Sequence, residues 1–188
     1  MEKLIQIARD VSLDRFSSHM GAQSAIIQDT EDGCINKIRS FHTSTIIISG
    51  KDIRMTFKIH FDSDTAIYFA SRCFKKDPTD YPQTKAIDFF KEYVNLVAGR
   101  IKKIFHGQNI PVGISLPIVT RGFDEIFFSG ADKSDEYISN TWGIKENEEI
   151  VYCTCVVDSF NKQMVKELKY PEENQKTTGA EEGEVNFL

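Results

Sequence analysis

Residues 43–61, which read TSTIIISGKDIRMTFKIHF, contain two segments typical of β-strands. Thr43–Ser49 holds a run of β-branched residues, and Ile53–Phe61 alternates apolar and polar residues without a break. This alternation predicts a half-buried strand, with apolar side chains on one face and Arg54, Thr56, Lys58 and His60 on the other. The polar residues 49–52 predict a hairpin turn. We therefore expect an antiparallel pair with one face toward water.

Helical periodicity dominates two other segments. Residues 3–20 predict an amphipathic helix, and residues 84–106 predict the longest helix of the chain. The shorter expected elements are helices at 65–74 and 158–168 and strands at 24–27, 111–119, 124–129, 136–144 and 150–157. Strands on both sides of one long helix predict an α+β fold, with a mainly antiparallel sheet and helices packed on one face.

The composition of the 188 residues is that of an ordinary globular protein, with 40% hydrophobic and 27% charged residues. A formal net charge of -5 argues against a general nucleic-acid binder, which usually has a basic face. No apolar run approaches the roughly 18–20 residues of a membrane helix, and the first residues lack signal-peptide features. We therefore expect a cytoplasmic protein without membrane insertion, whose cysteines are reduced.

One domain is expected to span residues 1–168, because a chain of this length fits a single core. Residues 169–188 are predicted to form an acidic C-terminal tail. From residue 166 onward the sequence contains six Glu and three Lys and shows no apolar periodicity. Most of the net negative charge therefore belongs to the end of the chain, and the body is nearly neutral.

Several kinds of enzyme site have no motif in this sequence. Neither a Gly-rich phosphate loop nor a Gly-x-Ser-x-Gly nucleophile turn is present. The four histidines show no ligand spacing and predict surface or helix-end positions: His19, His42, His60 and His106. We accordingly expect no metal site in this chain.

Two short patterns have simple structural interpretations. Asp62-Ser63-Asp64 follows a predicted strand, as an Asp-x-Asp phosphotransfer motif would, but a helix begins there and capping explains both aspartates. Cys153 and Cys155 are two residues apart in a predicted strand, so both thiols should point to the same face. This spacing favours two small core residues over a metal or redox site.

The predicted long helix carries one polar row opposite its apolar stripe. At about 100° per residue, four residues fall within about 60° of one another: Asp88, Glu92, Asn95 and Gly99. A mid-helix glycine costs roughly 1 kcal/mol relative to alanine, so Gly99 needs a reason, such as close approach of another molecule beside Asn95. The alternative is that the row is only the solvated face of an amphipathic helix.

This row resembles the Asp/Ser-x-x-x-Glu-x-x-Asn-x-x-x-Gly helix of the CheC/CheX/FliY family of chemotaxis phosphatases. A second segment, Ser115–Gly122 (SLPIVTRG), is similar to the Ser-hydrophobic-Pro strand that follows this helix in the family. The resemblance covers about residues 20–157. The chain has a single Glu-x-x-Asn helix, as in the CheX type, and the expected fold is CheC-like.

The resemblance implies a phosphatase that hydrolyses the phosphoaspartate of a CheY-like receiver domain. Asn95 would orient the attacking water, and Glu92 would dock on the active-site lysine of the receiver. Asp88 would support the site or its docking edge, and Gly99 would leave room for the receiver. Mg²⁺ would come with the receiver, so no cofactor of the chain's own is expected. The resemblance also implies a homodimer.

Phe89, Phe90 and Tyr93 are bulkier than the residues common at these positions in the family, and we expect them to affect which receiver docks. The alternative function is a non-catalytic, dimeric receiver-binding or scaffold module of the same fold. Retention of both Glu92 and Asn95 favours the phosphatase. Both side chains must then be accessible on the surface of the helix.

Overall fold

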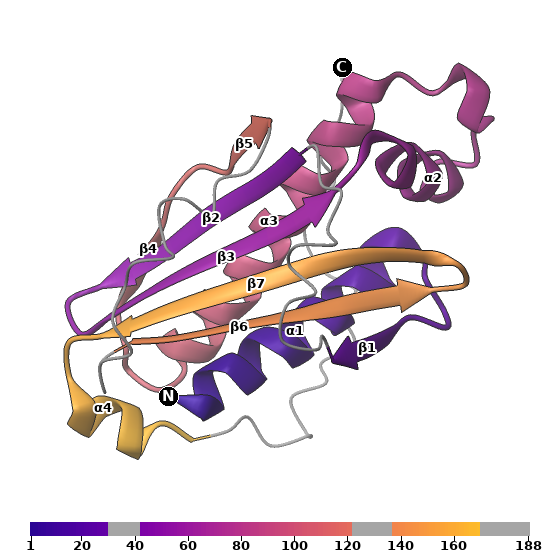
Figure 1. Cartoon of the computed structure of the whole chain (residues 1–188). Coiled ribbons are helices and arrows are strands. Elements are labelled where there is room, and N and C mark those ends of the chain that lie inside the picture. The colour runs from indigo at the N-terminus through magenta and orange to yellow at the C-terminus, as the bar shows by residue number, and fades with distance from the viewer. Residues whose placement is uncertain (30–41, 122–136, 170–188) are drawn as a thin grey trace.

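The computed structural model describes residues 1–29, 42–121 and 137–169 (Figure 1). Its elements, in chain order, are α1 (Glu2–Met20), β1 (Ile26–Asp29), β2 (His42–Gly50), β3 (Ile53–Phe61), α2 (Ser63–Cys73), the 3-10 helix η2 (Pro78–Asp80), α3 (Gln83–His106), β4 (Val112–Ile114), β5 (Ile118–Arg121), β6 (Tyr137–Glu146), β7 (Glu149–Ser159) and α4 (Lys162–Glu167).

The described strands form one seven-stranded sheet in the order β1-β6-β7-β3-β2-β4, with β5 also paired to β2. Every pairing is antiparallel. The hairpin expected at residues 43–61 is confirmed as β2 and β3, in a register that sets Ile46 opposite Phe57. The chain continues from this central hairpin through α2 into α3, so the middle of the sheet leads directly to the long helix.

Helices α1 and α3 cover one face of the sheet, and α2 lies at one end of α3 (Figure 1). The core between the layers contains Phe57 of β3, Phe90 of α3 and Trp142 of β6, all fully buried. Apolar burial of this kind is the main favourable contribution to folding. The expected α+β class, an antiparallel sheet with helices on one face, is confirmed.

Ser12 of α1 links the two main helices to the sheet. Its backbone carbonyl accepts a hydrogen bond of 2.9 Å from the Tyr93 hydroxyl of α3, and its side-chain oxygen accepts one of 3.1 Å from the Trp142 indole of β6. All three residues are buried. Because buried polar groups need partners, these bonds hold α1 and α3 in one arrangement over the sheet.

The predicted helix boundaries at α1, α2 and α3 agree with the structure to within two residues. Gly21 ends α1 in the left-handed conformation, with φ 62°. Asp62 caps α2 as expected, since its carboxylate accepts a hydrogen bond of 2.8 Å from the Thr65 N–H. The first strand begins at Ile26 instead of residue 24. The strand predicted at 124–129 and the tail beyond Lys169 lie outside the described residues.

The single strand predicted at 111–119 is wrong, because the segment is divided into β4 and β5. Pro117, which has no N–H to donate to a sheet, lies in the break. Ser115 bridges it. Its backbone N–H donates to the Ile47 carbonyl at 2.9 Å, and its side-chain oxygen accepts from the Ile47 N–H at 3.0 Å. The edge therefore stays attached to β2 across the break.

Most of the second face of β3 is closed to water, with only Arg54 exposed, so the half-buried strand was a wrong prediction. Lys58 and His60 are only 2% and 5% exposed. The two ring nitrogens of His60 lie 3.1 Å from the Thr43 hydroxyl and 3.0 Å from the Thr154 hydroxyl. Alternation shows which residues share a face but not whether that face is open to water. His60 has a possible hydrogen-bond partner on each neighbouring strand, as a buried polar side chain requires.

The same correction applies to two of the histidines. His42 and His60 are buried in the sheet, where surface or helix-end positions were expected. His19 lies in the last turn of α1 and His106 at the end of α3, as predicted. A helix that could cross a membrane is not found in the described parts of the chain.

Candidate functional site

The long helix α3 is held in place by one apolar face. Phe90, Val94, Val97 and Ile101 recur at helical spacing and are fully buried. They pack α3 against α1, α2 and the β2 side of the sheet. Because this face is fixed inward, the opposite face of the helix must point to the surface.

The structure brings the four residues of the polar row onto that outward face. Asp88, Asn95 and Gly99 are exposed, and Glu92 is half-buried. At 1.5 Å of rise per residue, the row extends over roughly 16 Å of the helix axis. It is a continuous polar strip on a helix surface, with both members of the Glu-x-x-Asn pair accessible to another molecule.

The members of this row differ in their hydrogen bonding. Asp88 accepts a hydrogen bond of 2.8 Å from the Lys91 ammonium, one turn along the helix. No hydrogen bond or ion pair joins Glu92 or Asn95 to any residue that the structure describes. The carboxylate and the amide are therefore available to a binding partner. Sequence analysis missed the Asp88–Lys91 pair, although its i, i+3 spacing on a helix would have indicated it.

Gly99 has no steric role inside the described chain. A Cβ built at this position meets no atom within 4 Å. Its φ is not positive, so the backbone would accept an L side chain without strain. The helix nevertheless keeps a glycine at a cost of roughly 1 kcal/mol relative to alanine. The residues that the structure describes therefore supply no steric reason for this glycine.

Phe89, Phe90 and Tyr93 lie in the core and not on the polar row. They are 5%, 0% and 0% exposed, and the hydroxyl of Tyr93 is bonded to α1. Burial raises the pKa of Tyr93 well above its ordinary value. We expected these bulky residues to affect which receiver docks. They cannot do so by direct contact, because none of them lies on the surface that a partner would meet.

The interpretation of Cys153 and Cys155 as two core residues is confirmed. Cys153 and Cys155 are fully buried in β7, and burial raises the pKa of both thiols, to about 12 for Cys155. A buried neutral thiol is neither a good nucleophile nor a ready metal ligand. Among the described residues, no group of three or more His, Cys, Asp or Glu side chains is arranged to bind a metal ion.

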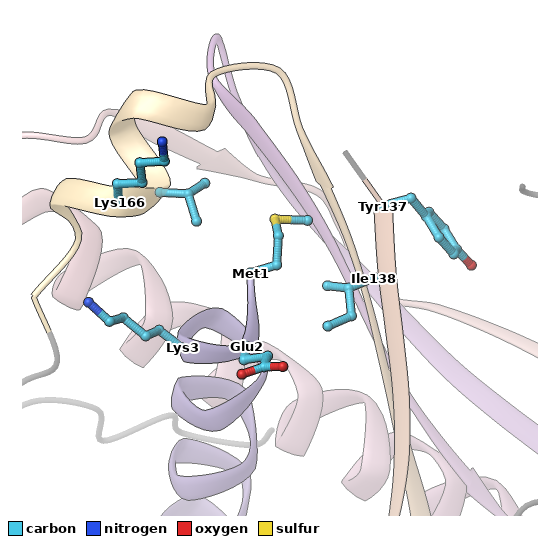
Figure 2. A pocket seen from close by; sticks show the side chains of 7 residues that line it. Met1, Glu2, Lys3, Tyr137, Ile138 and Lys166 are labelled. Carbon is cyan, nitrogen blue, oxygen red and sulfur yellow. The ribbon is translucent and has the colours of Figure 1, made fainter. Parts of the chain in front are cut away.

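One hollow of about 650 Å³ lies away from the polar row (Figure 2). It is formed where the start of α1, the start of β6 and α4 meet, and sequence analysis did not predict it. Its lining residues are Met1, Glu2, Lys3, Tyr137, Ile138, Val165 and Lys166. No residue of α3 contributes to it, so the hollow and the polar row are separate features of the surface.

Comparisons with known proteins agree with this architecture. The family model described as "Chemotaxis phosphatase CheX" matches residues 43–134, which include the central hairpin and the whole of α3. None of the curated proteins compared with this chain matches it.

Three solved structures have a similar fold. CheX from Vibrio vulnificus is 14% identical, with 82% of this chain and 99% of that chain covered and a TM-score of 0.62. A CheC-like protein from Shewanella oneidensis MR-1 is 13% identical, with coverages of 84% and 100% and a TM-score of 0.62. The CheX–CheY–BeF3–Mg²⁺ complex from Borrelia burgdorferi matches at 13% identity, with coverages of 82% and 97% and a TM-score of 0.64.

These likenesses define the fold as the CheC-like α+β class, in which this chain carries one Glu-x-x-Asn helix on its surface. Together with the match of the family model to residues 43–134, they make this chain similar to the CheX-type proteins of the chemotaxis phosphatases.

Proposed function

We propose that this protein hydrolyses the phosphoaspartate of a CheY-like receiver domain, using the exposed row of α3 as its docking and catalytic surface. The observation that carries the proposal is that the side chain of Asn95 is accessible and unpaired within the described chain. Its amide is exposed and hydrogen-bonded to no described residue, one turn from an equally unpaired Glu92. The complex of CheX with CheY from Borrelia burgdorferi supports a receiver as the partner of a protein with this fold.

Asn95 would bind and orient the attacking water. An acyl phosphate is already activated, so its hydrolysis depends more on alignment than on a covalent nucleophile. A carboxamide both donates and accepts hydrogen bonds and does not titrate near neutral pH. In this step the water oxygen bonds to phosphorus, the bond from phosphorus to the aspartyl oxygen breaks, and inorganic phosphate leaves a free aspartate on the receiver.

Glu92 would form an ion pair with the active-site lysine of the receiver and thereby set the register of docking. A half-buried carboxylate can form such a pair with less competition from water than a fully exposed one. Asp88, one turn before Glu92, is paired with Lys91, which leaves Glu92 as the unpaired anion of the row. Asp88 would support this edge of the site.

Mg²⁺ belongs to the receiver in this proposal and supplies charge neutralisation at the phosphoryl group. Glu92 and Asn95 approach the phosphoryl group from the other molecule, and neither has to bind the metal ion. The chain therefore contributes alignment and docking, while the receiver contributes the phosphoryl group and its cation.

The test is the decay of a phosphorylated CheY-like receiver with wild-type protein, Asn95→Ala and Glu92→Ala. We expect wild-type protein to accelerate decay and Asn95→Ala to lose about a hundredfold or more of this acceleration, because misalignment alone costs that much. Glu92→Ala should mainly weaken receiver binding. Glu148→Ala, an exposed glutamate in the turn between β6 and β7, is the matched control and should behave as wild type.

Two outcomes would contradict the proposal. If wild-type protein binds the receiver but leaves its decay unchanged, the protein is the non-catalytic receiver-binding module that is the alternative reading of the sequence. If decay is accelerated but Asn95→Ala is as fast as wild type, the water is oriented by another residue.

A further inference from the structure

The second half of α3 is basic in a protein whose body is otherwise nearly neutral. Arg100, Lys102 and Lys103 follow Asn95, and the sequence contains no Asp or Glu between Glu92 and Asp124. The first half of the helix is balanced, because Lys85 and Lys91 offset Asp88 and Glu92. Since the body of the protein is nearly neutral, this local run of cations is a distinct feature of the helix.

Lys102 lies in line with the proposed catalytic pair. It follows Asn95 by seven residues, so the helix returns it to within about 20° of Asn95 and roughly 10 Å farther along the axis. Gly99, with open space beside it, lies between them. A molecule that reaches Asn95 over this glycine therefore meets Lys102 next.

The lysines at this end of α3 have no acidic partner within the described chain. Lys102 is half-buried and Lys103 exposed, and neither forms a hydrogen bond or an ion pair with a described residue. Lys91, at the other end of the row, is paired with Asp88 at 2.8 Å.

The helix macrodipole explains only part of this charge. Its effect is confined to the last turn of a helix, which in α3 contains Lys103 and His106. Lys102 precedes that turn, so stabilisation of the helix end does not account for it.

The size of a receiver brings this end of α3 into the same contact. A small domain is about 30 Å across, whereas Lys102 is only about 15 Å from Glu92 along the helix axis. A domain of this size centred on Glu92 and Asn95 extends far enough along the helix to reach Lys102.

We infer that the C-terminal half of α3, with Lys102 at its centre, is a second, cationic contact that selects a receiver with an acidic surface beside its phosphorylated site. This inference rests on the proposed function and adds a specificity determinant to it. Glu92 and Asn95 meet features expected of any phosphorylated receiver, and Lys102 distinguishes receivers by the charge next to that site. Opposite charges at the rim of an interface act mainly on the association rate and on its salt dependence.

The test is equilibrium binding of a CheY-type receiver with an acidic surface beside its active site, loaded with beryllofluoride and Mg²⁺, at low and high salt. Lys102→Glu should weaken binding about tenfold at low salt, with a smaller difference at high salt because exposed charges are screened. Lys102→Arg keeps the charge and should bind as wild type. Lys145→Glu is the matched control, since Lys145 lies on β6, three strands from β2 in the sheet.

The outcomes separate this inference from the proposed function. Equal binding by Lys102→Glu and Lys145→Glu would overturn the cationic contact and leave the phosphatase proposal standing. A salt-independent loss in Lys102→Glu would likewise overturn it, because a packing defect and not charge would be the cause. Failure of wild-type protein to bind any loaded receiver would overturn both. A preference for acidic over neutral receivers that Lys102→Glu abolishes supports the inference.

Discussion

Replacing Gly99 with alanine separates the stability of α3 from its proposed function. The new methyl group would meet no atom within 4 Å, and φ at this position is not positive. The substitution should therefore recover helix propensity and raise the free energy of unfolding by about 1 kcal/mol. In a domain of this size, that gain corresponds to an increase of about 2–4 °C in the melting temperature.

The same methyl group should impair the receiver reaction. If a receiver passes close to the helix at Gly99 to reach Asn95, an added methyl displaces it, and small displacements of reacting groups cost up to about a hundredfold in rate. We expect at least a tenfold fall in the acceleration of phosphoryl decay, about 1.4 kcal/mol. Urea unfolding and receiver decay, measured on the same preparations, give the two quantities.

Gly113→Ala is the matched control. Gly113 is exposed on β4, and an added Cβ would meet only the Ser49 carbonyl oxygen, at 3.8 Å. This variant should also gain stability, by about 0.5–1 kcal/mol, without a change in activity. A more stable Gly99→Ala protein with full activity would refute the argument that a partner requires this glycine. A less stable Gly99→Ala protein would refute the conclusion that the space beside Gly99 is open.

Three further predictions concern the scaffold. Asp62→Ala should lower the free energy of unfolding, measured by urea denaturation, by about 1 kcal/mol through loss of the α2 cap. Asp62→Asn should retain most of the stability that the cap contributes. Tyr93→Phe should cost about 1 kcal/mol by removing the hydrogen bond to Ser12 and leave receiver affinity unchanged; an altered affinity would show that Tyr93 reaches the docking surface. The pKa of Cys155 is raised to about 12. The folded state therefore keeps a proton that the unfolded state releases, and stability should fall as the pH rises from about 8.5 toward 12, less steeply in Cys155→Ala.

The central hairpin and the long helix could be predicted because their signals are local. Ile53–Phe61 alternates at the period of a strand, and Gln83–His106 repeats at the period of a helix. The same helical period places Asp88, Glu92, Asn95 and Gly99 on one face before any tertiary contact is known. The candidate row was therefore visible in the sequence, together with the glycine that requires an explanation.

The burial of the second face of β3 could not be predicted in the same way. Alternation in Ile53–Phe61 distinguishes two faces, but it does not indicate how many strands flank them. Lys58 and His60 are nevertheless buried, and the ring of His60 lies within hydrogen-bonding distance of Thr43 on β2 and of Thr154 on β7, a strand that is distant in the sequence. Likewise, the segment 111–119 was predicted as one strand despite Pro117, and only the Ser115–Ile47 hydrogen bonds show how the edge passes this residue.

The sequence by itself determined the faces of α3, because residue spacing and helix geometry are enough to group side chains by direction. Only the tertiary structure decided which face meets solvent and what remains unpaired there. Packing of Phe90 and Val94 against the core turns Asn95 outward, and the amide then finds no hydrogen-bond partner among the described residues. Spacing is a property of neighbouring residues, whereas exposure and the absence of a partner depend on contacts with elements that are far apart in the chain.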